Sequence, residues 1–437
     1  MDYSKFWSDD VGAFMRSPVR EIFRGYDLAK LYSFAGGYPD ASTFPLGEME
    51  TLAVTVVAKY GAVALQYGST QGVTELRQAI AQRYGVDISN VQITTSSQQG
   101  IDVCTRVLVD PGDVVLTSNP CYLGALQSFR AYRADVRPLA FSAGVDDPGG
   151  TPPTLSAPAP PNVSCMVSDH LSPSGPIPLP LSGGGQALRG HHPGLHSPRA
   201  KMIYVIPDFQ NPSGVTMTLE ERRALVDFAR REDLIIVEDS PYRELRYEGE
   251  DVPTIWSLAP ERTLHLGSFS KIFAPGLRLG WILGPQELLE QIYVCKQSLD
   301  LCPPVFDQYM AVEYLVSGAL DANLQRTRRL YRSKRDLMLS LLEKYMPQGV
   351  SWTHPEGGLF LFVTLPEDMD TVALYDTALG AGVAYVAGSF FYTDGSHRNT
   401  MRLNFSFIDT SRMEAGVKLL AEIIRRECSR RSKLGTT

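Results

Sequence analysis

The feature that most constrains the fold is a regular alternation of short apolar segments with amphipathic helices, which begins at about residue 90. The segment MIYVIPDF is apolar almost throughout, as is typical of a strand buried on both faces. Thr218 precedes a helical segment and has Glu221 three residues later, which is the pattern of a capping box. The alternation predicts an α/β fold with a mostly parallel sheet flanked by helices. The expected strands are residues 91–95, 113–119, 202–209, 234–240 and 262–270.

The chain has 437 residues, which is long enough for a large and a small domain. From about residue 325 a long charged helix is followed by three apolar segments, and this pattern predicts a smaller α+β domain. We expect residues 61–324 to form the large domain and residues 325–437 the small domain. The N-terminal segment, residues 1–60, is expected to pack with the small domain.

Residues 149–200 differ in composition from the rest of the chain. They contain 11 prolines, 8 glycines and one acidic residue. Proline at this density removes helix donors and blocks helical backbone angles, so the segment is expected to lack helix and strand and to be disordered. Two interpretations stay open, a flexible insertion and an out-of-frame segment.

Composition and charge exclude several classes of protein. The net charge is 41 − 48 = −7, which gives no reason to expect nucleic acid or an anionic membrane as a partner. No uncharged apolar run approaches the roughly 20 residues of a membrane span, and the N-terminus lacks the apolar core of a signal peptide. The six cysteines have no metal-ligand spacing, so we expect no metal site and a cytoplasmic location.

Polar residues follow several of the expected strands, at the edge where α/β sheets bind ligands. Lys271 follows the strand 262–270 in the run SFSK, and an amine in that position attacks an aldehyde only when its pKa is lowered. Asp239 ends the apolar run LIIVED, where a buried carboxylate needs a cation such as a protonated pyridine nitrogen. The simpler alternatives are a surface lysine and a structural salt bridge.

The other strand ends suggest an anion site, a ring site and a carboxylate site. An anion would suit Ser97 and Gln98, which lie at the start of a helix, together with Ser268, Ser270 and Arg278 around the lysine. Tyr122 could stack on an aromatic ring, and Asn211 and Tyr242 could hydrogen-bond a phenolic oxygen. Arg402, in MRLNFS, suits a bidentate carboxylate contact. Each residue also has an ordinary structural explanation, such as a helix cap or an ion pair.

Taken together, these motifs resemble a known family. The run SFSK with Arg278 seven residues later, FQNPSG, VEDSPY and MRLNFS resemble the class I/II aminotransferases of pyridoxal-phosphate (PLP) fold type I. RSPVREI (16–22), SFAGGYPD (33–40), LQYGSTQGVTELR (65–77) and TTSSQQG (94–100) are similar to the 2-aminoadipate/kynurenine aminotransferase branch. The resemblance extends over essentially the whole chain except residues 149–200 and the last few residues.

The resemblance implies a PLP enzyme that moves an amino group between an amino acid and 2-oxoglutarate, the amino acid being 2-aminoadipate-like, aromatic or branched. Lys271 would hold the cofactor covalently and move a proton, and Asp239 would pair with the pyridine nitrogen. The rest of the cofactor would be held by Asn211, Tyr242, Tyr122, Ser97, Gln98, Ser268, Ser270 and Arg278. The substrate would contact Arg402, Asn211, Gly37 and, through its side chain, Arg20.

The resemblance also implies a homodimer with shared active sites, because Tyr67 would reach the phosphate bound by the neighbouring subunit. Two departures from the branch are Ser96, where Gly is usual, and Ser240, where a second Asp is common.

Other functions share part of this pattern. β-Lyases, decarboxylases and synthases of the same fold type also need Lys271 and Asp239, whereas Arg402 with Arg20 favours a transaminase that accepts 2-oxoglutarate. A regulator with a DNA-binding domain is disfavoured because the motifs begin at about residue 16. A non-catalytic binding protein would have no need of Lys271. The physiological amino donor is left open.

Overall fold

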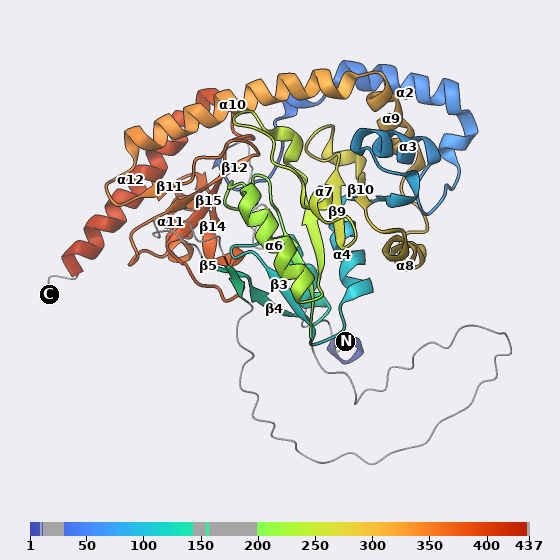
Figure 1. The fold of residues 1–437 in the computed structure, drawn as a ribbon. Helices are drawn as coiled ribbons and strands as arrows, with labels where there is room; N and C mark the ends of the chain where they lie inside the picture. Colours follow the sequence, from blue (N-terminus) through green and yellow to red (C-terminus); the bar gives the residue numbers. More distant parts are fainter. Residues whose placement is uncertain (9–10, 12–29, 143–153, 157–198, 435–437) are drawn as a thin grey trace, which may run out of the picture.

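The computed structural model describes residues 1–8, 11, 30–142, 154–156 and 199–434 (Figure 1). Arg20 and most of the proline-rich segment therefore lie outside the described residues. Within them, two sheets and a long connecting helix organise the chain.

The larger sheet has seven strands in the order β2-β10-β9-β8-β7-β3-β4. The strands are β2 (Val91–Thr94), β3 (Val114–Thr117), β4 (Asp135–Pro138), β7 (Ala200–Val205), β8 (Ile235–Asp239), β9 (Thr263–Ser268) and β10 (Gly280–Leu283). The predicted mostly parallel sheet is confirmed, and all five expected strands belong to it. Only β10 runs antiparallel to its neighbours, β2 and β9.

Helices cover both faces of this sheet. One face packs against α4 (Ser96–Leu108), and the other packs against α6 (Leu219–Arg231) and α7 (Ile255–Leu258), each with its own buried apolar cluster. The predicted capping box at the start of α6 is present, with Thr218 Oγ1 accepting from Glu221 N at 3.2 Å. The remaining helices of this part are α3 (Thr74–Tyr84), α5 (Leu123–Ala131) and α8 (Gln286–Gln297).

The smaller sheet is antiparallel, in the order β11-β12-β15-β14. Its strands are β11 (Ser351–Trp352), β12 (Phe360–Thr364), β14 (Val386–Ala387) and β15 (Thr400–Asn404), and its helices are α11 (Thr371–Gly380) and α12 (Thr410–Leu434). Beside it, β1 (Tyr32–Ser33) pairs in parallel with β13 (Val383–Ala384), so the chain just before residue 40 lies against this part of the molecule.

Helix α10 (Ala319–Tyr345) extends from α9 (Val305–Val316) and α2 (Leu46–Tyr60) to α12, along the top of the view in Figure 1. The buried Lys334 on this helix contacts the carboxylate of Asp40 and donates to the carbonyl oxygens of Ser406 and Ile408, at 2.7 and 2.8 Å. Through Lys334, α10 fixes the N-terminal segment against the chain that follows β15.

The sequence prediction is wrong at one end of the proline-rich segment. Residues Thr154–Ser156 form strand β6, which pairs antiparallel with β5 (Ala140–Ser142), although no strand was expected between residues 149 and 200. Three residues are enough because the pairing needs only extended backbone and no hydrophobic period. Short 3₁₀ helices, labelled η, cover Ser4–Phe6, Ala41–Thr43, Gly61–Leu65, Ile88–Asn90, Arg243–Leu245, Pro275–Leu277 and Gly388–Phe391.

Two absences hold for the part of the chain that the structure describes. No helix there has the length and apolar character needed to cross a membrane. Nor do three or more His, Cys, Asp or Glu side chains come together as metal ligands.

Candidate active site

The residues predicted at strand ends come together at one edge of the larger sheet. Asp239 and Ser268 are the last residues of the adjacent strands β8 and β9, and Asn211 lies in the loop after β7. Ser97 belongs to the first turn of α4, and Tyr122 immediately precedes α5. Because parallel strands end at the same edge, residues far apart in the sequence share one site.

Asp239 is a buried acid at this site with only one of its two oxygens hydrogen-bonded. Its side chain is buried, its Oδ2 accepts a hydrogen bond from Tyr204 at 2.7 Å, and its Oδ1 has no partner in the described chain. Burial raises the pKa of Asp239 to about 7, although the hydrogen bond from Tyr204 acts in the opposite direction. The carboxyl group therefore has one oxygen open to a hydrogen-bond donor or a cation.

Lys271 lies three residues beyond the end of β9 and is half-buried. Its Nζ donates to the backbone carbonyl of Gly37 at 2.8 Å. Burial, with the positive charges of Arg402 and Arg278, lowers the pKa of Lys271 to about 8. The amine is therefore partly deprotonated near neutral pH, as a lysine that acts as a nucleophile must be.

Arg402 reaches the same site from β15 of the smaller sheet. Its terminal nitrogens donate to Asn211 Oδ1 at 2.8 Å and to Ala35 O at 2.5 Å, and its Nε has no partner in the described chain. The guanidinium lies over the ring of Phe360, with 4.4 Å to the centroid, and burial lowers its pKa to about 10. No carboxylate pairs with it among the described residues, so the simpler alternative for Arg402, a structural ion pair, is not found there.

Tyr242 and Asn211 lie close together at this edge of the sheet. Tyr242 is buried and packs edge-on against Phe360 at 5.7 Å between ring centroids, and Asn211 lies close enough to act on the pKa of its hydroxyl. Burial raises the pKa of the Tyr242 hydroxyl, so it stays protonated at neutral pH.

The predicted anion-binding residues surround the start of α4. Arg278 Nη2 donates to Ser96 Oγ at 2.5 Å, and the Ser268 hydroxyl accepts from Ser270 N at 3.1 Å. Ser96 itself has φ +70°, a conformation that glycine adopts with less strain, and its hydroxyl holds Arg278 in place. A Cβ at Gly280 would lie 2.9 Å from Ser97 N, so this close approach needs glycine.

Gln98 and Tyr122 support each other. The Tyr122 hydroxyl donates to Gln98 Oε1 at 3.2 Å, and Gln98 Nε2 donates to Gly124 O and Ser128 Oγ, both at 3.1 Å. Tyr67, by contrast, is 79% exposed and is not brought into the site by this chain.

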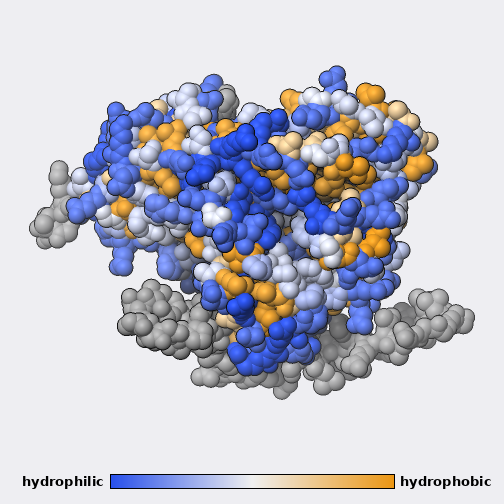
Figure 2. Space-filling view, turned by 45° about the horizontal axis from the view of Figure 1, so that its top comes forward, coloured by the Kyte–Doolittle hydropathy of each residue, from blue (hydrophilic) through white to orange (hydrophobic). Residues whose placement is uncertain are grey.

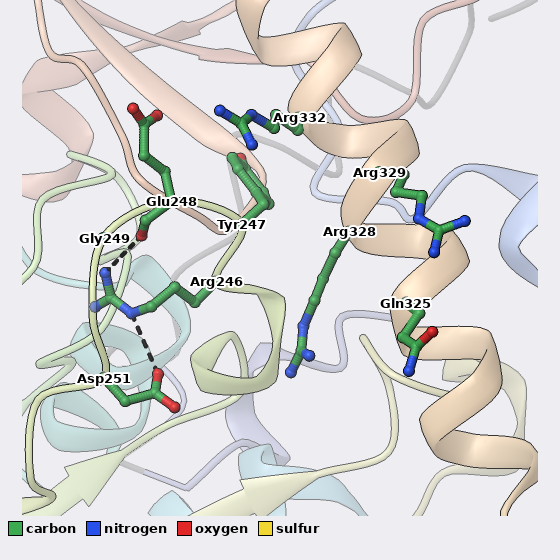
Figure 3. Close-up of a pocket in the computed structure, with 9 residues that line it drawn as sticks. All are labelled: Arg246, Tyr247, Glu248, Gly249, Asp251, Gln325, Arg328, Arg329 and Arg332. Carbon is green, nitrogen blue, oxygen red and sulfur yellow. Dashed lines mark hydrogen bonds and ion pairs between the residues drawn. The ribbon is translucent and has the colours of Figure 1, made fainter.

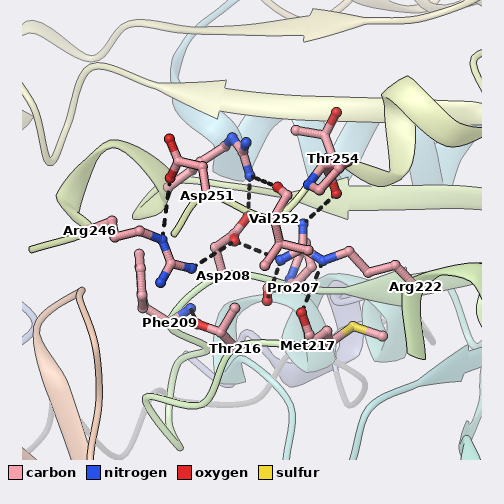
Figure 4. A network of polar contacts seen from close by, with 12 residues as sticks. Pro207, Asp208, Phe209, Thr216, Met217, Arg222, Arg246, Asp251, Val252 and Thr254 are labelled. Carbon is pink, nitrogen blue, oxygen red and sulfur yellow. Dashed lines mark hydrogen bonds and ion pairs between the residues drawn. The ribbon is translucent and has the colours of Figure 1, made fainter. Parts of the chain in front are cut away.

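Sequence reasoning missed the residues that position the others. Asp208 accepts from the fully buried Arg222 at 2.7 Å and from Arg243 at 3.2 Å, and this network fixes the loop that carries Asn211 (Figure 4). Tyr204, the partner of Asp239, could have been found, because its hydroxyl interrupts the otherwise apolar residues 202–205 of strand β7.

The arrangement fits PLP. An aromatic ring with a protonated nitrogen and a phosphate needs an acid, a cation and hydroxyl groups around one space, and the strand ends supply all three. The open Oδ1 of Asp239 is the decisive observation, because a buried carboxylate oxygen without a partner is costly unless a ligand completes it.

The chain belongs to a family defined as aminotransferase class I and II, whose model matches residues 47–147 and 190–420. It is therefore a PLP-dependent aminotransferase of fold type I. The match is interrupted within the segment whose composition is atypical.

Curated relatives and solved structures agree with this family. The chain is 39% identical to aromatic-amino-acid aminotransferase 1 of Thermococcus litoralis, over 98% of this chain and 96% of the relative. It is 32% identical to the 2-aminoadipate transaminase of Thermus thermophilus, over 97% of this chain and 98% of the relative. A crystal structure of Pyrococcus horikoshii kynurenine aminotransferase in complex with PMP matches with a TM-score of 0.82 and 37% identity, over 98% of both chains.

Proposed function

We propose that this aminotransferase moves the amino group of a 2-aminoadipate-like, aromatic or branched amino acid to 2-oxoglutarate, with Lys271, Asp239 and Arg402 as its central residues. The proposal is carried by the convergence of a buried acid with an open oxygen, a lysine of lowered pKa and an unpaired buried arginine. The names of the relatives, which include aromatic-amino-acid and 2-aminoadipate enzymes, support this range of donors.

The cofactor would be held by the residues around the strand ends. Asp239 Oδ1 would accept a hydrogen bond from the ring nitrogen, and Tyr242 with Asn211 would bind the ring oxygen. Tyr122 would stack on the ring. The phosphate would bind Ser97, Gln98, Ser268, Ser270 and Arg278.

Lys271 would carry out the proton transfer. Bound PLP weakens the Cα–H bond of an amino acid by drawing electrons into its ring. With a pKa of about 8, the Lys271 amine can take a proton from Cα and return it at neutral pH. The Gly37 carbonyl, which accepts from Lys271 Nζ at 2.8 Å, would aim the amine.

Arg402 would bind the α-carboxylate of the substrate. Its position over Phe360, with Phe391 at 5.2 Å from the guanidinium, keeps it in a largely apolar environment where a carboxylate contact is strong. Gly37 and Asn211 would lie beside the substrate, and Arg20 would contact an acidic or aromatic substrate side chain. Arg20→Ala should then affect those substrates most.

A second copy of the chain would complete the site. Tyr67 is exposed, and helix α2 and the 3₁₀ helix Gly61–Leu65 beside it also expose large apolar side chains, which are Leu46, Val54, Val57, Val63 and Leu65. Figure 2 shows hydrophobic residues gathered on its upper right. Burying them in a homodimer would place Tyr67 against the phosphate of the neighbouring subunit. An active monomer in light scattering would contradict this arrangement.

The same proposal includes the division of the chain and its location. Residues 61–324 would form the large domain and residues 325–437 the small one, with the segment 1–60 packed against the small domain. A cytoplasmic location agrees with the free thiols of the five described cysteines.

The test is a panel of amino donors against 2-oxoglutarate, with separation of the products. We expect glutamate and the matching 2-oxo acid in equal amounts for the preferred donor, and borohydride reduction should leave the cofactor attached to Lys271. Products of decarboxylation or β-elimination without glutamate would instead identify another reaction of this fold type.

A further inference from the structure

The cavity between the loop 246–251 and helix α10 adds no group to the site of Lys271. It has a volume of about 460 Å³, and none of the residues proposed for the cofactor or the substrate lines it (Figure 3). Its acids are neutralised within the chain, Asp251 by Arg246 and Glu248 by Arg335. Further support for the cofactor lies instead beside the strand ends, at the start of α4.

A polar network joins the start of α4 to the loop 298–304, which connects α8 to α9. Its centre is Asp300. The Oδ2 atom accepts from Thr95 Oγ1 at 2.9 Å and from Gln99 Nε2 at 2.7 Å, and the Oδ1 atom accepts from Lys296 Nζ at 2.7 Å. We call these four residues the Asp300 network. Three donors from two segments far apart in the sequence thus meet on one carboxylate.

The network keeps Asp300 ionised although the residue is largely buried. Lys296 is fully buried, and the side chain of Asp300 is 24% exposed. Burial acts to raise the pKa of Asp300, but the hydrogen bonds from Lys296 and Gln99 and the charge of Lys296 lower it below its ordinary value. The carboxylate is therefore a stable acceptor at neutral pH, and Lys296 balances its charge.

Gln99 connects the carboxylate to the backbone of the helix start. Its Oε1 accepts from Thr95 N at 2.8 Å while its Nε2 donates to Asp300, so both ends of the amide are engaged. Thr95 and Gln99 are four residues apart and share one face of the helix, whereas Ser97, two residues after Thr95, faces another way. Asp300 thus holds one face of the first turn and leaves the face of Ser97 to the anion site.

We propose that Asp300 is a positioning residue for the cofactor phosphate, because it holds the start of α4 in the arrangement in which Ser97 and Gln98 meet that phosphate. The inference rests on the proposed function, which takes Ser97, Gln98 and Arg278 as phosphate-binding residues. Donors at a helix start bind an anion best when they are already in place, since binding then requires no further ordering.

Two effects of Asp300 on a phosphate have opposite signs. Its negative charge would repel the phosphate, whereas its hydrogen bonds order the groups that bind it. Because Lys296 lies 2.7 Å from the carboxylate and offsets its charge, we expect the ordering effect to be the larger one. The direction in which PLP affinity changes when the carboxylate is removed therefore distinguishes the two.

The test compares PLP with pyridoxal, which has the same ring and aldehyde but no phosphate. Absorbance titrations of the full-length enzyme, after removal of its cofactor, give the dissociation constant of each compound. Asp300→Ala should raise the dissociation constant of PLP about tenfold and leave that of pyridoxal within about twofold. Asp300→Asn, which keeps the shape of the side chain and one acceptor oxygen, should raise the constant of PLP by less.

Asp102→Ala is the matched control. Asp102 is also on α4 and also accepts from two side chains, Arg106 at 3.0 Å and Tyr132 at 3.1 Å, but it lies beyond the first turn of the helix. This variant should leave both dissociation constants unchanged. Arg278→Ala tests the phosphate site itself and should weaken binding of PLP far more than binding of pyridoxal.

The two positions separate failure of the inference from failure of the proposed function. An equal loss for PLP and pyridoxal in the Asp300 variants, no loss, or tighter binding of PLP would overturn the inference; if Arg278→Ala still weakened PLP selectively, the proposed phosphate site would stand. If Arg278→Ala also failed to distinguish PLP from pyridoxal, the phosphate would bind elsewhere, and both would be overturned.

Discussion

Strand β8 carries two neighbouring buried carboxylates, one on each face. In one of them both oxygens have hydrogen-bond partners, and in the other only one does. Glu238 is fully buried, and both of its oxygens are bonded: Oε1 accepts from Ile255 N at 3.0 Å, and Oε2 accepts from Trp256 N at 2.9 Å and lies 3.0 Å from His265 Nδ1. Asp239, the next residue, is buried equally well but has one oxygen without a partner.

The pKa values follow this difference. Burial alone would raise the pKa of Glu238, but His265 and the two backbone N–H groups lower it below its ordinary value. For Asp239 the burial effect dominates, and the pKa rises to about 7. Equal burial thus has opposite results, and the carboxylate left incomplete is the one that faces the site.

The largest expected effect concerns the Asp239 face. Lys271→Ala removes both the covalent hold on the cofactor and the base, so kcat/KM for transamination should fall by at least about 10⁴-fold. Steady-state rates with the preferred donor measure this. A variant that turned over at the normal rate would remove Lys271 from the mechanism.

The second-largest effect on activity is expected for Asp239→Asn. Loss of the charge opposite the ring nitrogen should lower the rate of the half-reaction with the amino donor about 10³-fold, or about 4 kcal/mol of transition-state stabilisation. Stopped-flow absorbance of the cofactor follows the half-reaction directly. An unchanged rate would mean that the open oxygen has no catalytic partner.

Removal of PLP should reveal the free-energy cost of burying the Asp239 carboxylate. Because burial raises the pKa of Asp239 from 3.8 to about 7, the PLP-free folded protein holds a proton that the unfolded chain releases. Its free energy of unfolding should therefore fall as pH rises from about 4 to about 7, by at most about 4 kcal/mol. Denaturant unfolding of PLP-free Asp239→Asn should lack this pH dependence, which makes that variant the control.

Arg402→Lys tests whether Arg402 acts in the same site as Asp239. Lysine keeps the charge but not the planar pair of donors, so kcat/KM should fall about 30-fold, or about 2 kcal/mol, for every donor. The panel of donors measures it, and an effect confined to one donor would place Arg402 at the substrate side chain instead.

The smallest effect on activity is expected at the completed face. Glu238→Gln should lower the free energy of unfolding by about 2 kcal/mol and leave kcat within about threefold. Because its folded pKa lies below the unfolded value of 4.5, the stabilisation is present at neutral pH and is lost as pH falls below about 4.5. Urea titrations at pH 7 and pH 3.5 measure the change in the free energy of unfolding and its dependence on pH. A loss of activity as large as that of Asp239→Asn would end the distinction between the faces.

The sequence predicts the parts of the fold that depend on pattern. The five apolar strands, the capping box at Thr218, and the polar residues at the ends of β7, β8 and β9 all follow from local residue types. Strand β10 was not predicted because GWIL is too short to show a period. Its antiparallel direction depends on pairing with β2 and β9.

Contacts between segments far apart in the sequence could not be predicted from local patterns. The pairing of Arg222 with Asp208 joins a helix residue that looks like a solvated surface position to an acid near the end of the expected strand 202–209, and no local pattern in the sequence indicates that the two meet. The state of Asp239 is similar: its place at a strand end can be read from the sequence, but the open oxygen depends on Tyr204 from another strand.

Two cations of the site are held by carbonyl oxygens of one N-terminal stretch, Arg402 by Ala35 and Lys271 by Gly37. Every residue type has such an oxygen, so substitution at either position leaves the acceptor in place. An alanine scan across this stretch would therefore leave both acceptors in place, and a loss at Gly37 would come from the added Cβ, which would lie 3.2 Å from the Phe360 ring. Deletion or insertion of one residue there would move both acceptors at once. Length, rather than residue identity, is thus the property of this stretch on which selection would act most strongly.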